Sequence, residues 1–115
     1  MTHDNSNVEL FRQQVQLQQD IQRQVSEQFA PEDAGLRHAL RAAREQGLPE
    51  IQISPLQGRM LQVLVAACDA HTILEIGAIG GYSGIWLARA LPDDGHLITL
   101  EISPKHAEAV RSAFA

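Results

Sequence analysis

The sequence predicts an α/β protein in which helices come first and the β-α-β-α start of a doubly wound parallel sheet follows. Residues 72–76 and 96–101 are short, apolar and rich in β-branched side chains, which is typical of buried parallel strands. A stretch with helical periodicity follows each of these segments. Such alternation of strand and helix predicts parallel pairing and helices packed on the sheet.

Three helices are expected before the first strand. In residues 8–29 most apolar side chains recur three or four positions apart, and neither Gly nor Pro interrupts them. Residues 31–33, Pro-Glu-Asp, suit the first turn of a second helix, which Gly47 and Pro49 end. A capping box of Ser54 and Gln57 predicts the start of the third helix. The residues expected on its buried face are Leu56, Met60, Val63, Leu64 and Ala67.

The remaining elements follow from turn and capping signals. We expect a helix over residues 82–91, with Trp86 in the core, and a turn over residues 92–95. Ser103 and Pro104 predict the start of a last helix, for which the chain provides no stop signal. Residues 1–51 would then form an N-terminal helical segment and residues 52–115 the first part of the α/β domain, within one structural domain overall.

Composition excludes some classes of function. The net charge of −5 over 115 residues argues against a nucleic-acid-binding module, which would carry a basic face. The single cysteine, Cys68, cannot form an internal disulfide and is expected to be buried and inert on an apolar helix face. No secretory signal and no apolar run of membrane-spanning length is visible. We therefore expect a cytoplasmic protein without nucleic-acid or membrane partners.

Two features that carry chemistry should meet at the carboxyl ends of the two strands, where doubly wound folds bind their ligands. The first is the glycine-rich turn over residues 77–81, whose backbone can approach a ligand closely. The second is Glu101, 24 residues after Gly77, at a distance typical of an acid that binds the two hydroxyls of a ribose. Together they predict a site for an adenosine-containing cofactor.

The glycine spacing and Glu75 favour S-adenosylmethionine over a nicotinamide dinucleotide. The turn reads G-x-x-G-G, whereas the dinucleotide fingerprint is G-x-G-x-x-G. Glu75, two residues before the first glycine, would repel a pyrophosphate but tolerate an amine and a sulfonium. The cofactor carboxylate would lie at the helix start near Tyr82 and Ser83, where free N–H groups and an outward-pointing Ser83 hydroxyl could bind it. A nucleotide-dependent oxidoreductase stays open as the weaker alternative.

Three segments of the sequence resemble the bacterial branch of the cation-dependent class I O-methyltransferases, relatives of the catechol and caffeoyl-CoA O-methyltransferases. The segments are ISPLQG (residues 53–58), ILEIGAIGGYSGIWLARALPDDG (73–95) and LITLEISPKHAEAVR (97–111). The resemblance implies a Rossmann-like methyltransferase sheet and covers the chain from about residue 52 onward. It also implies a small hydroxylated, catechol-like acceptor, and we expect a homodimer.

The resemblance implies cofactor contacts at the matching positions. The backbone at Ile53 would lie beside the methionine end, and Glu101 would bind the ribose. The other implied contacts are Glu75, Gly77, Ala78, Gly81, Tyr82 and Ser83. Ala78 departs from the threonine more common in the family, but a backbone contact would survive that change.

The same resemblance implies a divalent cation, commonly Mg²⁺, and places its ligands and the catalytic residues beyond position 115. We assign no residue of this chain to a metal. The chain is therefore expected to be the N-terminal part of a longer enzyme. A second possibility, which the absence of metal ligands motivates, is a non-catalytic remnant that self-associates through its helices. Two strands alone would also leave a hydrophobic sheet edge open, so we expect either a fragment of a longer enzyme or a chain that associates with copies of itself.

Overall fold

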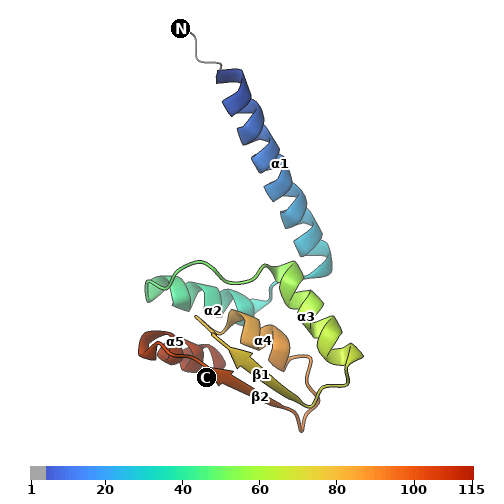
Figure 1. The fold of residues 1–115 in the computed structure, drawn as a ribbon, viewed down its shortest axis with the longest axis vertical. Helices are drawn as coiled ribbons and strands as arrows, with labels where there is room; N and C mark the ends of the chain where they lie inside the picture. The colour runs from blue at the N-terminus through green and yellow to red at the C-terminus, as the bar shows by residue number, and fades with distance from the viewer. Residues whose placement is uncertain (1–4) are drawn as a thin grey trace. The chain divides into compact units, whose positions relative to one another are not determined.

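The computed structural model describes residues 5–115, which form two compact units, one ending at Pro31 and the other comprising residues 32–115. The order of the elements is the predicted one (Figure 1). The elements are α1 (Asn5–Phe29), α2 (Ala34–Glu45), α3 (Pro55–Ala67), β1 (Thr72–Ile76), α4 (Tyr82–Ala88), β2 (His96–Leu100) and α5 (Pro104–Phe114). The α/β fold class is confirmed. The predicted division into an N-terminal helical segment (residues 1–51) and the first part of the α/β domain (residues 52–115) stays a prediction.

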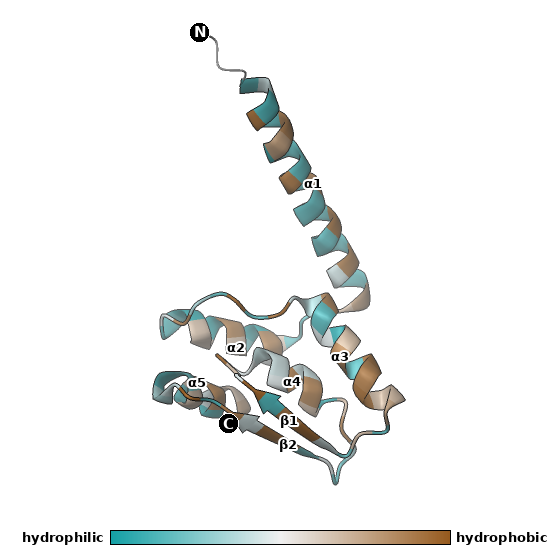
Figure 2. Ribbon diagram, viewed as in Figure 1, coloured by the Kyte–Doolittle hydropathy of each residue, from teal (hydrophilic) through white to brown (hydrophobic). Residues whose placement is uncertain are grey.

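Helix α1 makes up most of the first unit, and none of its residues is buried. Figure 2 shows hydrophobic and hydrophilic residues interspersed along its whole length. Phe11, Leu17 and Phe29 are each at least 60% exposed. The predicted helical stripe is thus present, and its apolar side chains face solvent.

Helix α2 begins three residues later than predicted. Pro31, Glu32 and Asp33 precede the helix, and Asp33 is its N-cap, with a side chain that accepts a hydrogen bond from the Leu36 N–H at 3.0 Å. The expected first turn at residues 31–33 is therefore wrong, because an extended capping residue satisfies a free N–H of the first turn. The Asp33 carboxylate also pairs with Arg89 at 2.7 Å and so ties the start of α2 to the end of α4.

Helix α3 starts with the predicted capping box of Ser54 and Gln57, but its buried face is not the predicted one. The buried residues are Gly58 and Val65, whereas Met60, Val63 and Leu64 are about half exposed. The cause is that α3 is apolar on most sides, so periodicity alone cannot select the face that packs. Cys68, the C-cap residue, is exposed, which contradicts its expected burial.

The core of the second unit is organised around Trp86, which is 2% exposed as predicted. A Cβ atom added to Gly58 would lie 2.5 Å from atoms of the Trp86 ring, so α3 can approach α4 only because residue 58 has no side chain. The Arg59 guanidinium lies over the Trp86 ring, 5.4 Å from its centroid. Leu36 and Ala39 of α2 are also fully buried.

The two strands pair in parallel, with Glu75 opposite Thr99 and Ile76 opposite Leu100, and α4 packs against β2. One face of this sheet is open within the described part of the chain. The alternating side chains of Leu74, Ile76, Ile98 and Leu100 are 49–78% exposed, and Ile102 just beyond β2 is 99% exposed. Figure 2 shows hydrophobic segments in both strands. Parallel sheets are normally covered on both faces, so this apolar face is unusual for an isolated fold.

Candidate functional site

The glycine-rich turn leads from β1 into α4 through three residues with left-handed backbone. The φ angles are +83° at Gly77, +51° at Ile79 and +84° at Gly81, which is the N-cap of α4. Glycine adopts this conformation freely, but a β-branched residue such as Ile79 does so at a cost of about 1–3 kcal/mol. Backbone strain of this kind is concentrated at ligand-binding and catalytic sites.

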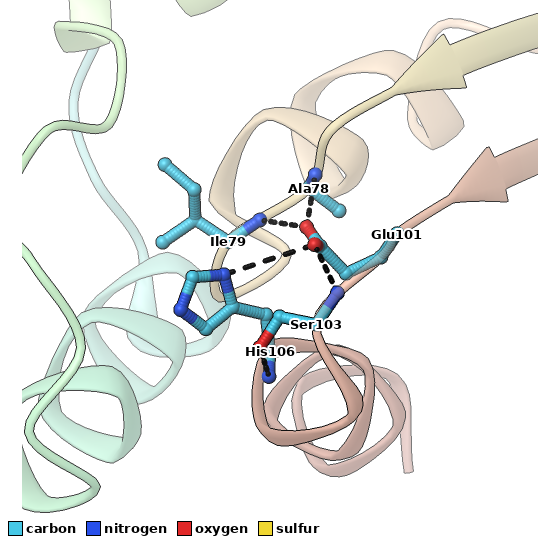
Figure 3. A network of polar contacts seen from close by, with 5 residues as sticks. All are labelled: Ala78, Ile79, Glu101, Ser103 and His106. Carbon is cyan, nitrogen blue, oxygen red and sulfur yellow. Dashed lines mark hydrogen bonds and ion pairs between the residues drawn. The ribbon is translucent and has the colours of Figure 1, made fainter.

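Glu101 offsets part of that strain by holding the turn directly (Figure 3). Its Oε2 atom accepts hydrogen bonds from the N–H groups of Ala78 at 3.0 Å and Ile79 at 3.1 Å. Its Oε1 atom accepts from the Ser103 N–H at 2.9 Å, and the Nδ1 atom of His106 lies 3.8 Å away. One carboxylate thus links the carboxyl ends of both strands and the start of α5.

These contacts stabilise the ionised form of Glu101. The N–H of Ser103 and then that of Ala78 contribute most, with Ile79 and His106 adding to them against a smaller effect of burial, and together they lower the pKa of Glu101 from 4.5 to about 2. The carboxylate is therefore charged at every physiological pH. The turn and Glu101, which the sequence predicted to meet, lie in direct contact.

Glu75 lies within the fold and is 9% exposed. Its carboxylate accepts hydrogen bonds from the hydroxyls of Ser83 and of Thr99, the latter at 3.0 Å. The Ser83 hydroxyl therefore points toward Glu75, and the expectation that it points outward is wrong. The physical reason is that a buried carboxylate requires donors, and these two hydroxyls are within reach. The assignment of both residues to the cofactor stays a prediction.

A pocket of about 120 Å³ opens beside the turn. Its walls include predicted cofactor residues together with Ala39, Leu40 and Ala43 of α2. The predicted residues in this lining are Ile53, Gly77, Ala78, Tyr82 and Ser83. The structure therefore gathers residues from three separate segments around one cavity. The contribution of α2 was missed, because nothing in its periodic sequence distinguishes a pocket wall from an ordinary packing face.

Tyr82 connects the pocket to the core. Its side chain is 3% exposed, its hydroxyl donates to the Glu32 carboxylate, and its ring meets Trp86 edge-on with centroids 6.4 Å apart. Burial first, and then the hydrogen bond to Glu32, raise the pKa of Tyr82 well above its usual value. Tyr82 thus stays protonated, donates a hydrogen bond to Glu32 and forms part of the pocket wall.

Two residues that hydrogen-bond to the site carboxylates, one to Glu75 and one to Glu101, were not predicted from the sequence. Thr99 lies opposite Glu75 in the strand register, so alignment of the two strands could have identified it. Ile79 has no sequence signal, because its strained backbone becomes visible only in the folded turn.

Within residues 5–115, no group of three or more His, Cys, Asp or Glu side chains could hold a metal ion. None of the described helices is long and apolar enough to cross a membrane.

Comparison with known families decides where the chain belongs. A family model described as "O-methyltransferase" matches residues 24–114, which is most of the sequence. The chain belongs to this family. The family resemblance expected from the sequence motifs is confirmed.

Relatives of known description are substantially longer than this chain. A catechol O-methyltransferase of Niastella koreensis is 47% identical over 92 residues, which are 80% of this chain and 42% of that protein. A catechol O-methyltransferase of Mycobacterium tuberculosis is 46% identical over 80 residues, which are 70% of this chain and 36% of that protein. The chain therefore spans about two fifths of the length of these O-methyltransferases.

Solved structures of similar proteins have the same fold in the matched region. The O-methyltransferase of Bacillus cereus, in complex with SAH (S-adenosylhomocysteine), superposes with a TM-score of 0.79 at 44% identity. An O-methyltransferase of Streptomyces achromogenes involved in tomaymycin synthesis, in complex with S-adenosylmethionine, gives a TM-score of 0.77 at 43% identity. Each match covers 83% of this chain and 43% of the other. The predicted Rossmann-like architecture of helices followed by the start of a parallel sheet is confirmed.

Proposed function

We propose that this chain is the S-adenosylmethionine-binding N-terminal part of an O-methyltransferase that acts on a small hydroxylated, catechol-like acceptor. The observation that carries the proposal is the contact between Glu101 and the strained turn at the carboxyl ends of both strands. Support comes from family membership and from two similar structures whose bound molecules are SAH and S-adenosylmethionine.

The described residues fit such a cofactor. Glu101 is ionised and lies where a ribose would approach the turn, so its carboxylate can accept from a hydroxyl. The pocket beside Tyr82 is smaller than the roughly 300–1,000 Å³ of typical small-molecule sites, so it would enclose one end of the cofactor rather than the whole. We assign that end to the methionine moiety, with the Ile53 backbone and Ala78 beside it. Glu75, which accepts a hydrogen bond from Ser83 of the pocket wall, would supply negative potential toward the cofactor amine.

The chemistry would be transfer of a methyl group to an acceptor oxygen. When bound, S-adenosylmethionine supplies an electrophilic methyl group on its sulfonium. The contribution of this chain is to hold and orient that donor, because a fixed approach of oxygen, carbon and sulfur lowers the entropic part of the barrier. Tyr82, which lines the pocket and is almost fully buried, would help to exclude water from the methionine end.

The divalent cation implied by the sequence resemblance does not fit this chain. Its described residues offer no suitable cluster of ligands, so we route no catalytic step through a metal here. We propose instead that Mg²⁺ binding, acceptor binding and general-base catalysis belong to the segments that the longer relatives have and this chain does not span.

We further propose that the chain forms a homodimer in the cytoplasm and that α1 contributes to the dimer contact. The support is the number of large apolar side chains that α1 exposes, among them Phe11 and Leu17. Solvent-exposed apolar residues of this size at helical spacing favour packing against another helix. Light scattering of the purified chain tests this proposal, and a monomeric mass at high concentration would contradict it.

A second candidate function is a non-catalytic remnant that self-associates. The open apolar sheet face of Leu74, Ile76, Ile98 and Leu100 favours it, because the face requires some cover in water. Turnover by this chain tests only the second candidate, because the first places catalysis in segments outside it. A remnant transfers no methyl group to a catechol when Mg²⁺ is present, whereas measurable turnover by the purified 115-residue chain excludes it.

Calorimetric titration with S-adenosylhomocysteine tests the cofactor-binding proposal. We expect saturable binding by the wild-type chain, loss of binding in Glu101→Ala, and unchanged binding in Lys105→Ala, an exposed neighbour on α5. Circular dichroism must show that both variants are folded. Absence of binding to the wild-type chain would overturn the proposal, and preferential binding of NADH would revive the oxidoreductase alternative.

A further inference from the structure

The hydrogen bonds of Glu101 leave little of its carboxylate available to a ligand. A carboxylate has about four acceptor positions, two on each oxygen. The N–H groups of Ala78 and Ile79 use both positions on Oε2, and the N–H of Ser103 uses one on Oε1. One acceptor position remains, on Oε1. A ribose diol presents two hydroxyls, so Glu101 alone cannot bind both while it holds the turn.

The remaining position faces His106. The Nδ1 atom of His106 is 3.8 Å from Oε1, beyond hydrogen-bonding distance and close enough for adjacent ribose hydroxyls to reach both atoms. Figure 3 shows the imidazole beside the same carboxylate oxygen that Ser103 contacts. The side chain of His106 is 26% exposed, so the ring is partly accessible.

The backbone of His106 is fixed in place. Its N–H donates at 3.3 Å to the hydroxyl of Ser103, the N-cap of α5. Within residues 5–115, the ring itself has no polar partner besides Glu101. The nearby carboxylate favours the tautomer with its proton on Nδ1. The ring therefore presents a positioned and unused donor next to the one free acceptor of Glu101.

We propose that His106 is a second ribose-binding residue. One hydroxyl of the ribose donates to Glu101 Oε1, and the neighbouring hydroxyl accepts from His106 Nδ1. The proposal rests on the proposed cofactor function and adds a residue to it. It also explains how Glu101 can hold the turn and the ribose at once, since the two tasks use different acceptor positions of the carboxylate.

The test is a comparison of ligands and variants by calorimetry. The variants are wild type, His106→Ala, His106→Asn and the control Lys105→Ala. The ligands are S-adenosylhomocysteine and its 2′-deoxy and 3′-deoxy analogues. His106→Ala removes one hydrogen bond to a ribose hydroxyl. We therefore expect this variant to bind S-adenosylhomocysteine about threefold to tenfold more weakly than wild type. His106→Asn, whose amide can donate from a similar position, should recover most of this loss, and Lys105→Ala should show none.

The deoxy analogues separate a direct contact from a structural role. For the analogue that lacks the hydroxyl bound by His106, wild type and His106→Ala should bind equally. An equal loss for all three ligands would mean that His106 only supports Glu101, and the proposal would be overturned. Unchanged binding of S-adenosylhomocysteine by His106→Ala would overturn it as well. Failure of the wild-type chain to bind S-adenosylhomocysteine would overturn the proposed cofactor function and this proposal together.

Discussion

Replacement of Glu101 by glutamine should destabilise the fold even when no cofactor is present. In the wild-type chain three backbone N–H groups converge on a charged acceptor. A glutamine side chain has nearly the same shape, but it offers one neutral oxygen, and its NH₂ group faces N–H donors. The variant therefore loses charge-assisted hydrogen bonds from the turn and from the start of α5 at the same time.

The pKa of Glu101 sets the size of the effect. A fall from 4.5 to about 2 corresponds to at most about 3 kcal/mol of stabilisation at neutral pH. The network is only partly buried, so solvent screens part of the attraction. We therefore expect Glu101→Gln to lower the free energy of unfolding by about 1–2 kcal/mol at pH 7.

The sign of the pH dependence follows from the direction of the shift. Because the folded-state pKa is depressed, the stabilisation is complete above pH 4.5 and is lost as the pH falls toward about 2. The wild-type chain should therefore lose its advantage over the variant in this window. At pH 7 and pH 6 the difference between the two proteins should be constant.

Urea unfolding of both proteins, measured by circular dichroism between pH 7 and pH 3, tests this reasoning. The difference in unfolding free energy should shrink steadily below pH 4.5. A difference that stays the same down to pH 3 would refute the assignment of the stabilisation to the charge of Glu101. A difference close to zero at pH 7 would show that the turn is held by its own backbone instead.

Three further predictions concern the core, the pocket and the open sheet face. Gly58→Val should destabilise the fold by about 1–3 kcal/mol, because its Cβ would overlap Trp86, and the fluorescence of this single tryptophan should shift. Tyr82 is the only tyrosine, so the absorbance of the folded chain at 295 nm should show no ionisation near pH 10, where burial and Glu32 keep the hydroxyl protonated. Leu74→Lys should reduce both binding of the dye ANS and self-association, with little loss of stability, because this side chain is 58% exposed.

Matched controls make these outcomes specific. Gly35→Ala is the control for Gly58→Val: the atom nearest its added Cβ belongs to the flexible end of Arg89, which can shift with some disturbance of its ion pair with Asp33, so we expect a smaller loss of stability. Ionisation of Tyr82 should appear at its usual pH once the chain is unfolded in urea. Leu17→Lys on α1 should leave ANS binding at the sheet unchanged, so an equal effect of both lysine variants would contradict a role for the sheet face.

Local signals predicted the framework of the second unit well. The capping box of Ser54 and Gln57, the strand over residues 72–76 and the burial of Trp86 all follow from short stretches of sequence whose chemistry is decided locally. The approach of Glu101 to the glycine-rich turn also followed, since parallel strands end at one edge of a sheet. The errors lie where local information is ambiguous, as on α3, where apolar residues on most sides hid the face that packs.

The sequence by itself determined the element order, the family and the two features that define the candidate site. These follow from periodicity, caps and motif spacing, all of which act over a few residues. Only the tertiary structure decided which partners each side chain takes. Glu101 accepts three hydrogen bonds from backbone N–H groups of the protein itself. Ser83 donates inward to Glu75, and His106 lies beside the one acceptor position of Glu101 that remains. Such choices depend on how the whole unit packs, because a buried charge takes whichever donors the fold brings within reach, as when Glu101 accepts from Ala78 and Ile79 of the distant turn.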